Sequence, residues 1–287
     1  MSGYRRDCMS RLIIRAGAAE RHYWADLWRF RELFFFLSWR DILVRYKQTV
    51  IGVLWALLRP IITITIFTIL FMRMAKAPSD GLPALVCVCA GNLPWQFFST
   101  AMSEASNSLV LNANMLSKIY FPRLIVPASA VIVAFVDLMI SLVILAALMA
   151  WYHIMPTWRL FTLPMFTLLG LGAALAVGLW LAALNVKYRD FRYVVPFVVQ
   201  LGFFASPVGY PTGWALAKAG AHRHAEILQA LYILNPMVGV IDGFRWAIGG
   251  QAPLSWSLIT SIGVIVIVGV SGLRYFRSTE KTFADII

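Results

Sequence analysis

The sequence predicts an all-α protein that crosses a membrane six times, with an amphipathic helix before the first transmembrane helix and a re-entrant outer segment between the fifth and the sixth. Two observations indicate this class. Of the 287 residues, 60% are hydrophobic and 13% are charged, whereas soluble domains have about 45–50% and about 25%. Several apolar stretches also exceed the roughly 18 residues that indicate a transmembrane helix. These stretches exclude a soluble protein with one large core.

The basic residues determine both the net charge of +12 and the orientation that we expect in the membrane. They are concentrated before residue 49, and the others lie mostly in short loops between apolar stretches. The positive-inside rule produces this distribution. We therefore expect both termini in the cytoplasm, contacts with membrane lipids, and no nucleic-acid partner. The three cysteines, Cys8, Cys87 and Cys89, have no histidine nearby, so we expect no metal site.

Residues 1–48 are expected to form a cytoplasmic basic tail followed by the amphipathic helix, and residues 49–287 to form the six-helix membrane domain. Before residue 47, aromatic and aliphatic side chains recur at three- and four-residue spacing, namely Trp24, Leu27, Trp28, Phe35, Trp39, Ile42 and Tyr46. Arginines lie off this stripe, as in helices that rest in the membrane interface. The periodicity leaves two interpretations open: a simple anchor, or a lever that contacts a cytoplasmic partner.

The first transmembrane helix is expected from about residue 50 to 72 and contains Arg59. A guanidinium inside the membrane is costly, so we expect it to face a water-filled interior or a partner. Gly52, Ala56, Arg59 and Thr63 share one face of this helix. That face serves either close helix packing or a polar path.

A second transmembrane helix is expected over 82–102, bent at Gly91 and Pro94 and closed by Glu104. The polar segment 107–122 follows it and is expected to leave the membrane on the cytoplasmic side.

The third transmembrane helix, over 125–152, contains Asp137. An acid in mid-membrane indicates either a proton relay or a structural hydrogen bond or ion pair. Because no second acid or histidine is expected at comparable depth in a nearby helix, the structural role is favoured. Arg59 is one conceivable partner.

The rest of the chain predicts a fourth helix over 160–184, a basic cytoplasmic turn at 185–193, a short fifth helix and a last helix over 256–276. The prolines of 206–211 stop the fifth helix. The segment 236–249 is apolar, but its core would be about 18 Å long as a helix, against about 30 Å of hydrocarbon. We therefore expect it to enter and leave the membrane on the outer side.

The sequence lacks the motifs of nucleotide-binding and hydrolytic sites, including the phosphate-binding loop, the zinc-peptidase helix motif and the serine-hydrolase elbow. We therefore expect that the chain is not an enzyme and binds no cofactor. A passive channel would also fit six helices. It would leave the amphipathic helix and the large cytoplasmic turns unexplained.

Five segments, in order along the chain, resemble the permease subunits of bacterial ATP-binding-cassette exporters for surface polysaccharides such as O-antigen, capsule and teichoic acid. They are 45–60 (RYKQTVIGVLWALLRP), 118–123 (KIYFPR), 185–193 (NVKYRDFRY), 206–211 (SPVGYP) and 234–246 (LNPMVGVIDGFRW). The resemblance extends from about residue 40 to the C-terminus and does not specify the polymer.

The resemblance implies that residues 49–287 are a permease domain, which works as a homodimer with two copies of a cytoplasmic ATPase. ATP and Mg would be bound by the ATPase and not by this chain. The implied substrate is a lipid-linked polysaccharide, exported across the bacterial cytoplasmic (inner) membrane. A pore between two copies is physically reasonable, because one six-helix bundle is too small to enclose a glycan. The alternatives are a drug or lipid exporter of the same architecture and, from another class, a membrane enzyme of glycan assembly.

The resemblance also assigns roles to residues. Two cytoplasmic turns would dock on the ATPase through Asn112, Asn114, Lys118, Tyr120, Phe121, Tyr188, Arg189 and Asp190. An outer gate would contain Pro207, Tyr210, Pro236, Asp242 and Arg245. Asp242 and Arg245, three residues apart, are expected to pair on one helix face.

The substrate path is expected to be lined by aromatic side chains, because these stack on the flat faces of sugars without fixing the position of a sliding polymer. The candidates, together with Arg59, are Trp55, Phe67, Trp95, Phe197 and Phe204. For each aromatic residue taken singly, contact with lipid or packing in the core is the competing interpretation.

Overall fold

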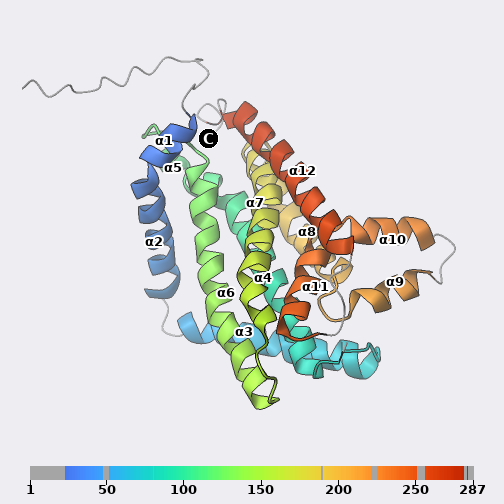
Figure 1. The fold of residues 1–287 in the computed structure, drawn as a ribbon. Coiled ribbons are helices and arrows are strands. Elements are labelled where there is room, and N and C mark those ends of the chain that lie inside the picture. The colour runs from blue at the N-terminus through green and yellow to red at the C-terminus, as the bar shows by residue number, and fades with distance from the viewer. Residues whose placement is uncertain are drawn as a thin grey trace, which may run out of the picture.

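The computed structural model describes residues 23–47, 52–79, 81–188, 190–220, 225–250, 256–280 and 283. Every regular element in these ranges is helical, which confirms the all-α class (Figure 1). The predictions for the basic tail before residue 23, Cys8 and Arg189 lie outside the described residues. The helices are, in chain order, α1 (Tyr23–Arg29), α2 (Arg31–Lys47), α3 (Gly52–Phe67), the π-helix η1 (Thr68–Met74), α4 (Ala84–Leu111), α5 (Ala113–Leu116), α6 (Ile125–Trp151), the 3₁₀-helix η2 (Trp158–Thr162), α7 (Leu163–Lys187), α8 (Phe191–Ala205), α9 (Thr212–Gly220), α10 (Ala225–Ile233), α11 (Pro236–Ile248) and α12 (Trp256–Thr279).

Helix α4 is the centre of the bundle. It packs against α6, α7 and α11, and every residue between Val86 and Trp95 is buried, Cys87 and Cys89 included. It runs through Pro94 as one helix, and it continues to Leu111, so the predicted end at Glu104 is wrong. Two features of the sequence explain the longer helix. Ala105 and Leu109 are buried in the bundle, and serine hydroxyls in this stretch bond to carbonyls one turn back, which suits polar residues to a helix.

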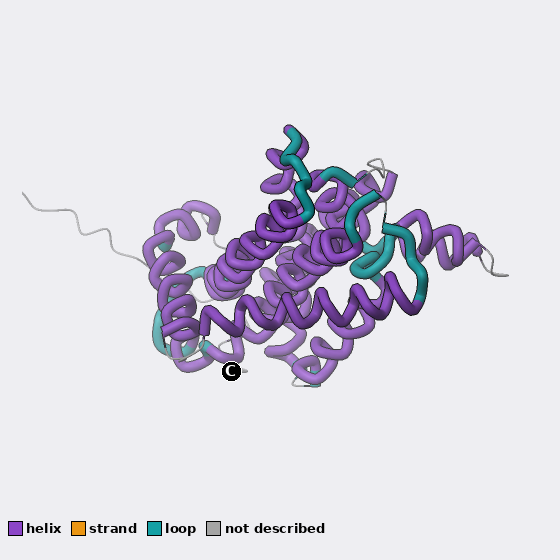
Figure 2. The backbone as a smooth tube through the Cα atoms, turned by 90° about the horizontal axis from the view of Figure 1, so that it is seen from below, coloured by secondary structure: helices purple, strands orange, loops and turns teal. Residues whose placement is uncertain are grey.

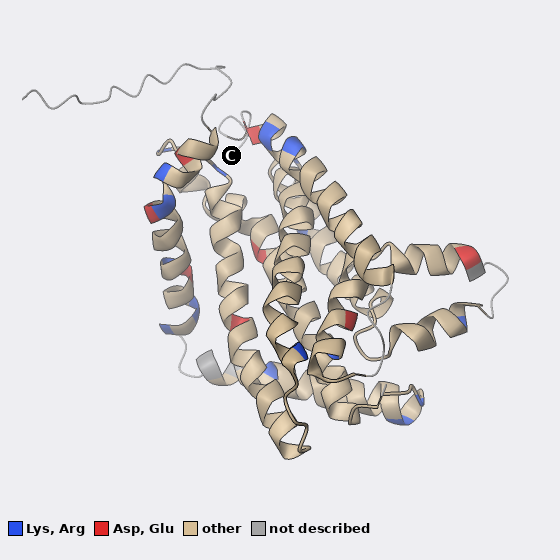
Figure 3. Cartoon of the chain, in the orientation of Figure 1, with Lys and Arg blue, Asp and Glu red and all other residues tan. Residues whose placement is uncertain are grey.

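The bundle has two ends, which we name by the helix that lies at each. At the α1 end, α4, α7 and α12 finish and α6 begins (Figure 1). At the α3 end, α3 and η1 cross the bundle near the start of α4, as the view from below shows (Figure 2). Charged side chains lie mainly at the two ends and along α2, whereas α7 and α12 are uncharged along their middle sections (Figure 3).

Four helical stretches in the described residues are long and apolar enough to cross a membrane: 57–74 in α3 and η1, α6, 158–187 in η2 and α7, and α12. A fifth candidate is the pair α10 and α11, which is bent by 72°. Helix α8 has 15 residues and is short, as the sequence predicted. Helix α4 is long enough to cross a membrane, but it is too polar to be a candidate span by composition. The chain is therefore a multi-pass membrane protein with four to five candidate spans.

The predicted amphipathic helix is divided at Phe30 into α1 and α2, and α2 packs along the side of α6 (Figure 1). Five of its large aromatic side chains are exposed, namely Trp24, Trp28, Phe35, Phe36 and Trp39. Arg40 instead contacts Asn112, the residue that follows α4, and Arg45 contacts Glu104 of α4. Two of its basic side chains face the bundle, because acceptors and acids in α4, in α6 and just after α4 bind them. The amphipathic interface helix stays a prediction.

Candidate functional site

The two turns predicted to bind an ATPase lie together at the α1 end. One connects α4 to α6 and contains α5; the other connects α7 to α8. The buried side chain of Asn185, at the end of α7, links the helices that carry them. Its amide donates to the carbonyl of Ser106 at 3.1 Å and to Oδ1 of Asn107 at 3.0 Å, both near the end of α4. These two hydrogen bonds connect the end of α7 to the end of α4, and so connect the helices from which the two turns begin.

Most of the predicted docking residues are available to a partner. Those with exposed side chains are Asn114, Lys118, Tyr120, Tyr188 and Asp190. Asn112 is half-buried at the end of α4. Phe121 is only 4% exposed and packs in an apolar cluster with Leu116 and Ile125. The prediction that Phe121 contacts the ATPase is therefore corrected: the side chain is unavailable at this surface and supports the turn from beneath.

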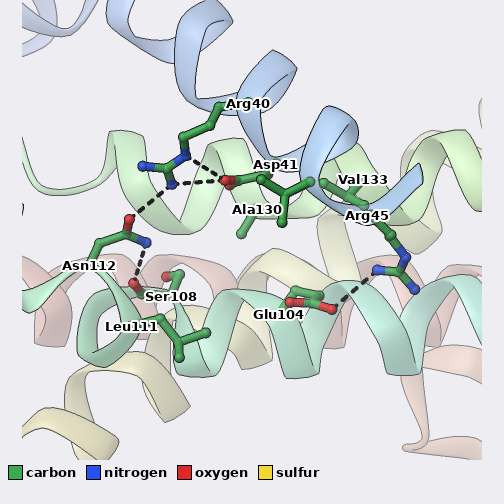
Figure 4. Close-up of a pocket in the computed structure, with 10 residues that line it drawn as sticks. Arg40, Asp41, Arg45, Glu104, Ser108, Leu111, Asn112, Ala130 and Val133 are labelled. Carbon is green, nitrogen blue, oxygen red and sulfur yellow. Dashed lines mark hydrogen bonds and ion pairs between the residues drawn. The ribbon is translucent and has the colours of Figure 1, made fainter. Parts of the chain in front are cut away.

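A polar contact joins α2 to the turn that follows α4 (Figure 4). The guanidinium of Arg40 donates to Oδ1 of Asp41 from Nε at 2.9 Å and from Nη2 at 2.8 Å, and Nη2 also donates to Oδ1 of Asn112 at 3.0 Å. Asn112 in turn donates to the carbonyl of Ser108 at 2.9 Å. A predicted docking residue thereby contacts the amphipathic helix directly.

One turn further along α2, Arg45 binds acids on two different helices. Its guanidinium lies 3.2 Å from Glu104 on α4 and 2.8 Å from Asp137 on α6. The hydroxyl of Tyr46 donates to Asp137 as well. Burial and the neighbouring Asp137 raise the pKa of Tyr46, so the phenol stays protonated as the donor.

These contacts identify the partners of Asp137. The structural ion pair favoured by the sequence is present, but its cation is Arg45, and the suggested partner Arg59 was wrong. Arg59 is exposed on α3. Sequence reasoning missed the cluster because its members lie 59 and 91 residues apart. The signal that could have found it was the presence of one acid, Asp137, inside an apolar stretch and of another, Glu104, at the predicted end of a second apolar stretch.

The space between α2, α4 and α6 contains a cavity of about 640 Å³. Its lining combines both signs of charge with amide and apolar groups (Figure 4): Arg40, Asp41, Val44, Arg45, Glu104, Ser108, Leu111, Asn112, Ala130 and Val133. Within the described ranges, no three His, Cys, Asp or Glu side chains gather as metal ligands. The arrangement serves to attach α2 to the bundle while leaving room beside it.

At the α3 end, the buried side chain of Arg245 holds a loop against α4. Its guanidinium donates to the carbonyls of Tyr210 at 2.9 Å, Val208 at 3.0 Å and Pro207 at 2.5 Å, and Nε lies 3.4 Å from the carbonyl of Cys87 on α4. We call this arrangement the carbonyl clamp. A buried guanidinium satisfied by several carbonyls fixes the backbone to which it binds.

The clamp depends on a glycine. A Cβ atom at position 91 would lie 2.3 Å from the carbonyl oxygen of Val208 and 2.7 Å from Nη2 of Arg245. Only a residue without a side chain lets α4 approach the loop so closely. The sequence predicted a bend at Gly91; the structure gives it the different role of making room for the clamp.

The predicted outer-gate residues meet here, but with different partners from those expected. Pro207 and Tyr210 belong to the clamped loop, and Pro236 begins α11. Asp242 accepts a hydrogen bond from Thr212 at 2.7 Å and one from Ser257 at 3.4 Å. The expected pairing of Asp242 with Arg245 is replaced by these bonds and by the carbonyl clamp.

The predicted pore aromatics divide into two groups. Phe67 packs against Phe203 with ring centroids 4.5 Å apart and the rings tilted by 42°, and Trp95 is 5% exposed beside Phe98. Both therefore pack against other aromatic side chains, which is the alternative to lining the path. Phe197 and Phe204, with Tyr193, are exposed along α8 at spacings that share one helix face. The side chain of Trp55 lies outside the described residues.

The clamped loop also contacts the helix that crosses the α3 end. Tyr210 lies edge-on to Phe71 of η1 with ring centroids 5.5 Å apart, and a Cβ atom on Gly209 would overlap the Phe71 ring. The clamped loop therefore contacts three other elements at one place: α4, α11 and η1.

The described residues form helices, and several of these helices are long and apolar enough to cross a membrane. The chain is therefore a multi-pass membrane protein. It belongs to the ABC-2 type transporter family, which it matches over residues 32–248. It is therefore the non-enzymatic membrane subunit of a transporter, and the family implies an ABC ATPase subunit as its partner.

Curated relatives are similar over nearly the whole chain. An "O-antigen export system permease protein RfbA" from Myxococcus xanthus is 28% identical over 263 residues, which cover 91% of this chain and 98% of that protein. A protein with the same description from Klebsiella pneumoniae is 22% identical over 251 residues, which cover 86% of this chain and 92% of that protein.

Proposed function

We propose that this chain is the permease subunit of an ATP-driven exporter that moves a lipid-linked polysaccharide of the O-antigen type across the bacterial cytoplasmic membrane. The observation that carries the proposal is the near full-length similarity to O-antigen export permeases within a matched transporter family. The joined, exposed turns at the α1 end are the surface that such a subunit needs for its ATPase.

The proposed topology has six spans: α3 with η1, α4, α6, α7, α8 and α12. It is supported by the burial of α4, whose polar residues are shielded inside the bundle, and by the direction of α4, α6, α7, α8 and α12, which alternates between the two ends (Figure 1). Helix α3 with η1 lies across the bundle at the α3 end and is included because its stretch 57–74 is long and apolar enough to cross. The bent pair α10 and α11 is the proposed re-entrant outer element, since the 13 residues of α11 are too few to cross. The α1 end would be cytoplasmic, and so would both termini.

The proposed assembly is a homodimer with two copies of the ATPase, which would bind ATP and Mg. Helices α3 and α8 have exposed apolar faces, which is expected of surfaces that contact another protein or lipid. The exposed apolar residues are Leu54, Ile61, Ile62 and Ile66 on α3, Ile69 on η1, and Tyr193, Val194, Phe197, Leu201 and Phe204 on α8. A twofold pair of these surfaces would enclose the glycan path, with Tyr193, Phe197 and Phe204 available to stack on sugar rings.

The amphipathic helix is proposed to act as a lever rather than as a simple anchor. Arg40 connects it to Asn112 beside the docking turn, and Arg45 connects it to α4 and α6. Motion of the turn would therefore reach both core helices through α2. A simple anchor in the interface requires none of these contacts.

The substrate class is tested by stimulation of ATP hydrolysis. The permease and its cognate ATPase are reconstituted in liposomes, and undecaprenyl-linked glycan is compared with hydrophobic drugs. The proposal expects stimulation by the glycan alone. Stimulation by drugs alone would favour a drug exporter, and chemical turnover of glycan by the purified chain without any ATPase would favour an enzyme.

A further inference from the structure

The end of α12 contacts the turn that precedes α6, at the α1 end. The backbone N–H of Arg123 donates to Oε1 of Glu280 at 2.8 Å, and the guanidinium of Arg123 donates to the backbone carbonyl of Glu280. Both groups of Arg123 are thus bound by one residue 157 positions away in the chain. Arg123 follows directly on the docking turn, so the C-terminal part of the chain fixes the point where that turn ends.

Phe283 strengthens the same contact. Its ring is fully buried, lies edge-on to Phe276 with centroids 5.5 Å apart, and has the Arg123 guanidinium over it at 5.8 Å. It belongs to the apolar cluster that also contains Phe121 and Leu116 of the turn. The turn is therefore supported by its own apolar side chains and by side chains near the C-terminus.

Helix α1 is attached at this point too. The ring of Tyr23 is 2% exposed, and the guanidinium of Arg277 lies 4.2 Å from its centroid. Burial and the carboxylate of Glu280 raise the pKa of Tyr23, which keeps the phenol neutral beneath the cation. Arg277, Glu280 and Phe283, which we call the C-terminal hook, thus connect α1, α12 and the docking turn.

We propose that the C-terminal hook positions the docking turn for the ATPase, with Glu280 and Phe283 acting through Arg123. The inference rests on the proposed function. The tip of the turn, Lys118–Tyr120, is exposed and follows α5, a helix of only four residues. A segment this short does not hold its own conformation. Without the hook, the partner must order the turn as it binds, and that cost is subtracted from affinity.

The test compares point variants in the full-length permease, reconstituted in nanodiscs with its cognate ATPase. Glu280→Ala and Phe283→Ala are expected to weaken ATPase binding about two- to tenfold, the range for ordering one or two side chains. Glu280→Gln keeps an acceptor oxygen for the Arg123 N–H and is expected to bind like the parent. Arg274→Ala, an exposed position on the last turns of α12, is the matched control and is also expected to bind like the parent.

Each measurement is paired with thermal unfolding of the permease alone. The proposal expects the Kd for the ATPase to rise in the two alanine variants, with little change of the unfolding temperature in Glu280→Ala and a lower unfolding temperature in Phe283→Ala, whose ring is fully buried. Unchanged binding in Phe283→Ala and Glu280→Ala would overturn it, and so would a loss of affinity that Arg274→Ala shares or that, in Glu280→Ala, only follows a loss of stability. Failure of the parent itself to bind the ATPase would contradict the proposed function instead.

Discussion

Arg45 and Arg245 each join segments that are far apart in the sequence, and each does so by a different chemistry. Arg45 is partly exposed and binds two carboxylates. Arg245 is buried and donates to backbone carbonyls. An ion pair in a partly solvated cavity is screened and can be exchanged, whereas a buried clamp is costly to break. We therefore assign movement to the helix that Arg45 holds and rigidity to the loop that Arg245 holds.

The coupling of Arg45 to Asp137 is measurable by a double-mutant cycle. Arg45→Ala leaves two acids without their cation, and Asp137→Asn removes one of them. Because both side chains are partly exposed, we expect a coupling energy of about 1–2 kcal/mol, inside the range of roughly 0.5–3 kcal/mol for residues in contact. The measurement is thermal unfolding of the four proteins in detergent. Additive effects of the two substitutions would show that the pair contributes nothing.

The carbonyl clamp predicts a strong effect of a small substitution. In Gly91→Ala, the new methyl group would collide with Val208 and Arg245, so we expect a loss on the order of 1–3 kcal/mol and displacement of the loop 206–211. Gly263→Ala on α12 is the matched control, since nothing lies within 4 Å of the added atom. Thermal unfolding compares the two variants. Equal stability of Gly91→Ala and Gly263→Ala would contradict the clamp.

At the scale of elements, the turn between α4 and α6 contains one side chain that stabilises the fold and another that is exposed to a partner. Phe121 is buried, so Phe121→Ala is expected to cost about 3–5 kcal/mol of stability. Lys118 is exposed, so Lys118→Asp is expected to leave stability within about 0.5 kcal/mol and to weaken ATPase binding. Unfolding and ATPase affinity are measured for both. If Lys118→Asp binds the ATPase normally, the exposed tip of the turn is not the docking surface.

Most helices could be predicted from the sequence, and the errors have a common cause. Apolar length alone located α6, α7 and α12, and the prolines after residue 205 located the end of α8. The end of α4 was placed too early because Glu104 was taken as a stop, whereas Arg45 from another helix neutralises it. Tertiary contacts that compensate a polar residue are invisible to periodicity.

The candidate sites were predicted less well for the same reason. The proposed docking turns were selected by motif resemblance, but which of their side chains face outward depends on packing, and Phe121 faces inward. Arg245 was predicted at the outer gate with the wrong partner, because local spacing suggested Asp242, three residues away. Its true partners are backbone carbonyls, which every sequence has and which only the fold brings near.

At the scale of the whole molecule, the two ends have complementary properties. The α1 end presents exposed polar and aromatic turns that α2 and the C-terminal hook connect to the bundle. The α3 end holds a clamped loop against η1 and α11. The α1 end can receive the motion of an ATPase, and the α3 end is held rigid. These properties suit a subunit in which ATP hydrolysis by a partner opens a path along the helices.

The most direct test of this account is transport itself. The permease and its cognate ATPase are reconstituted so that the α1 end faces outward, and radiolabelled undecaprenyl-linked polysaccharide is supplied on that side with ATP. The account predicts that labelled glycan accumulates in the lumen only when ATP is present and the ATPase is active. Accumulation without ATP, or sustained ATP hydrolysis in the presence of glycan with no label in the lumen, would contradict it.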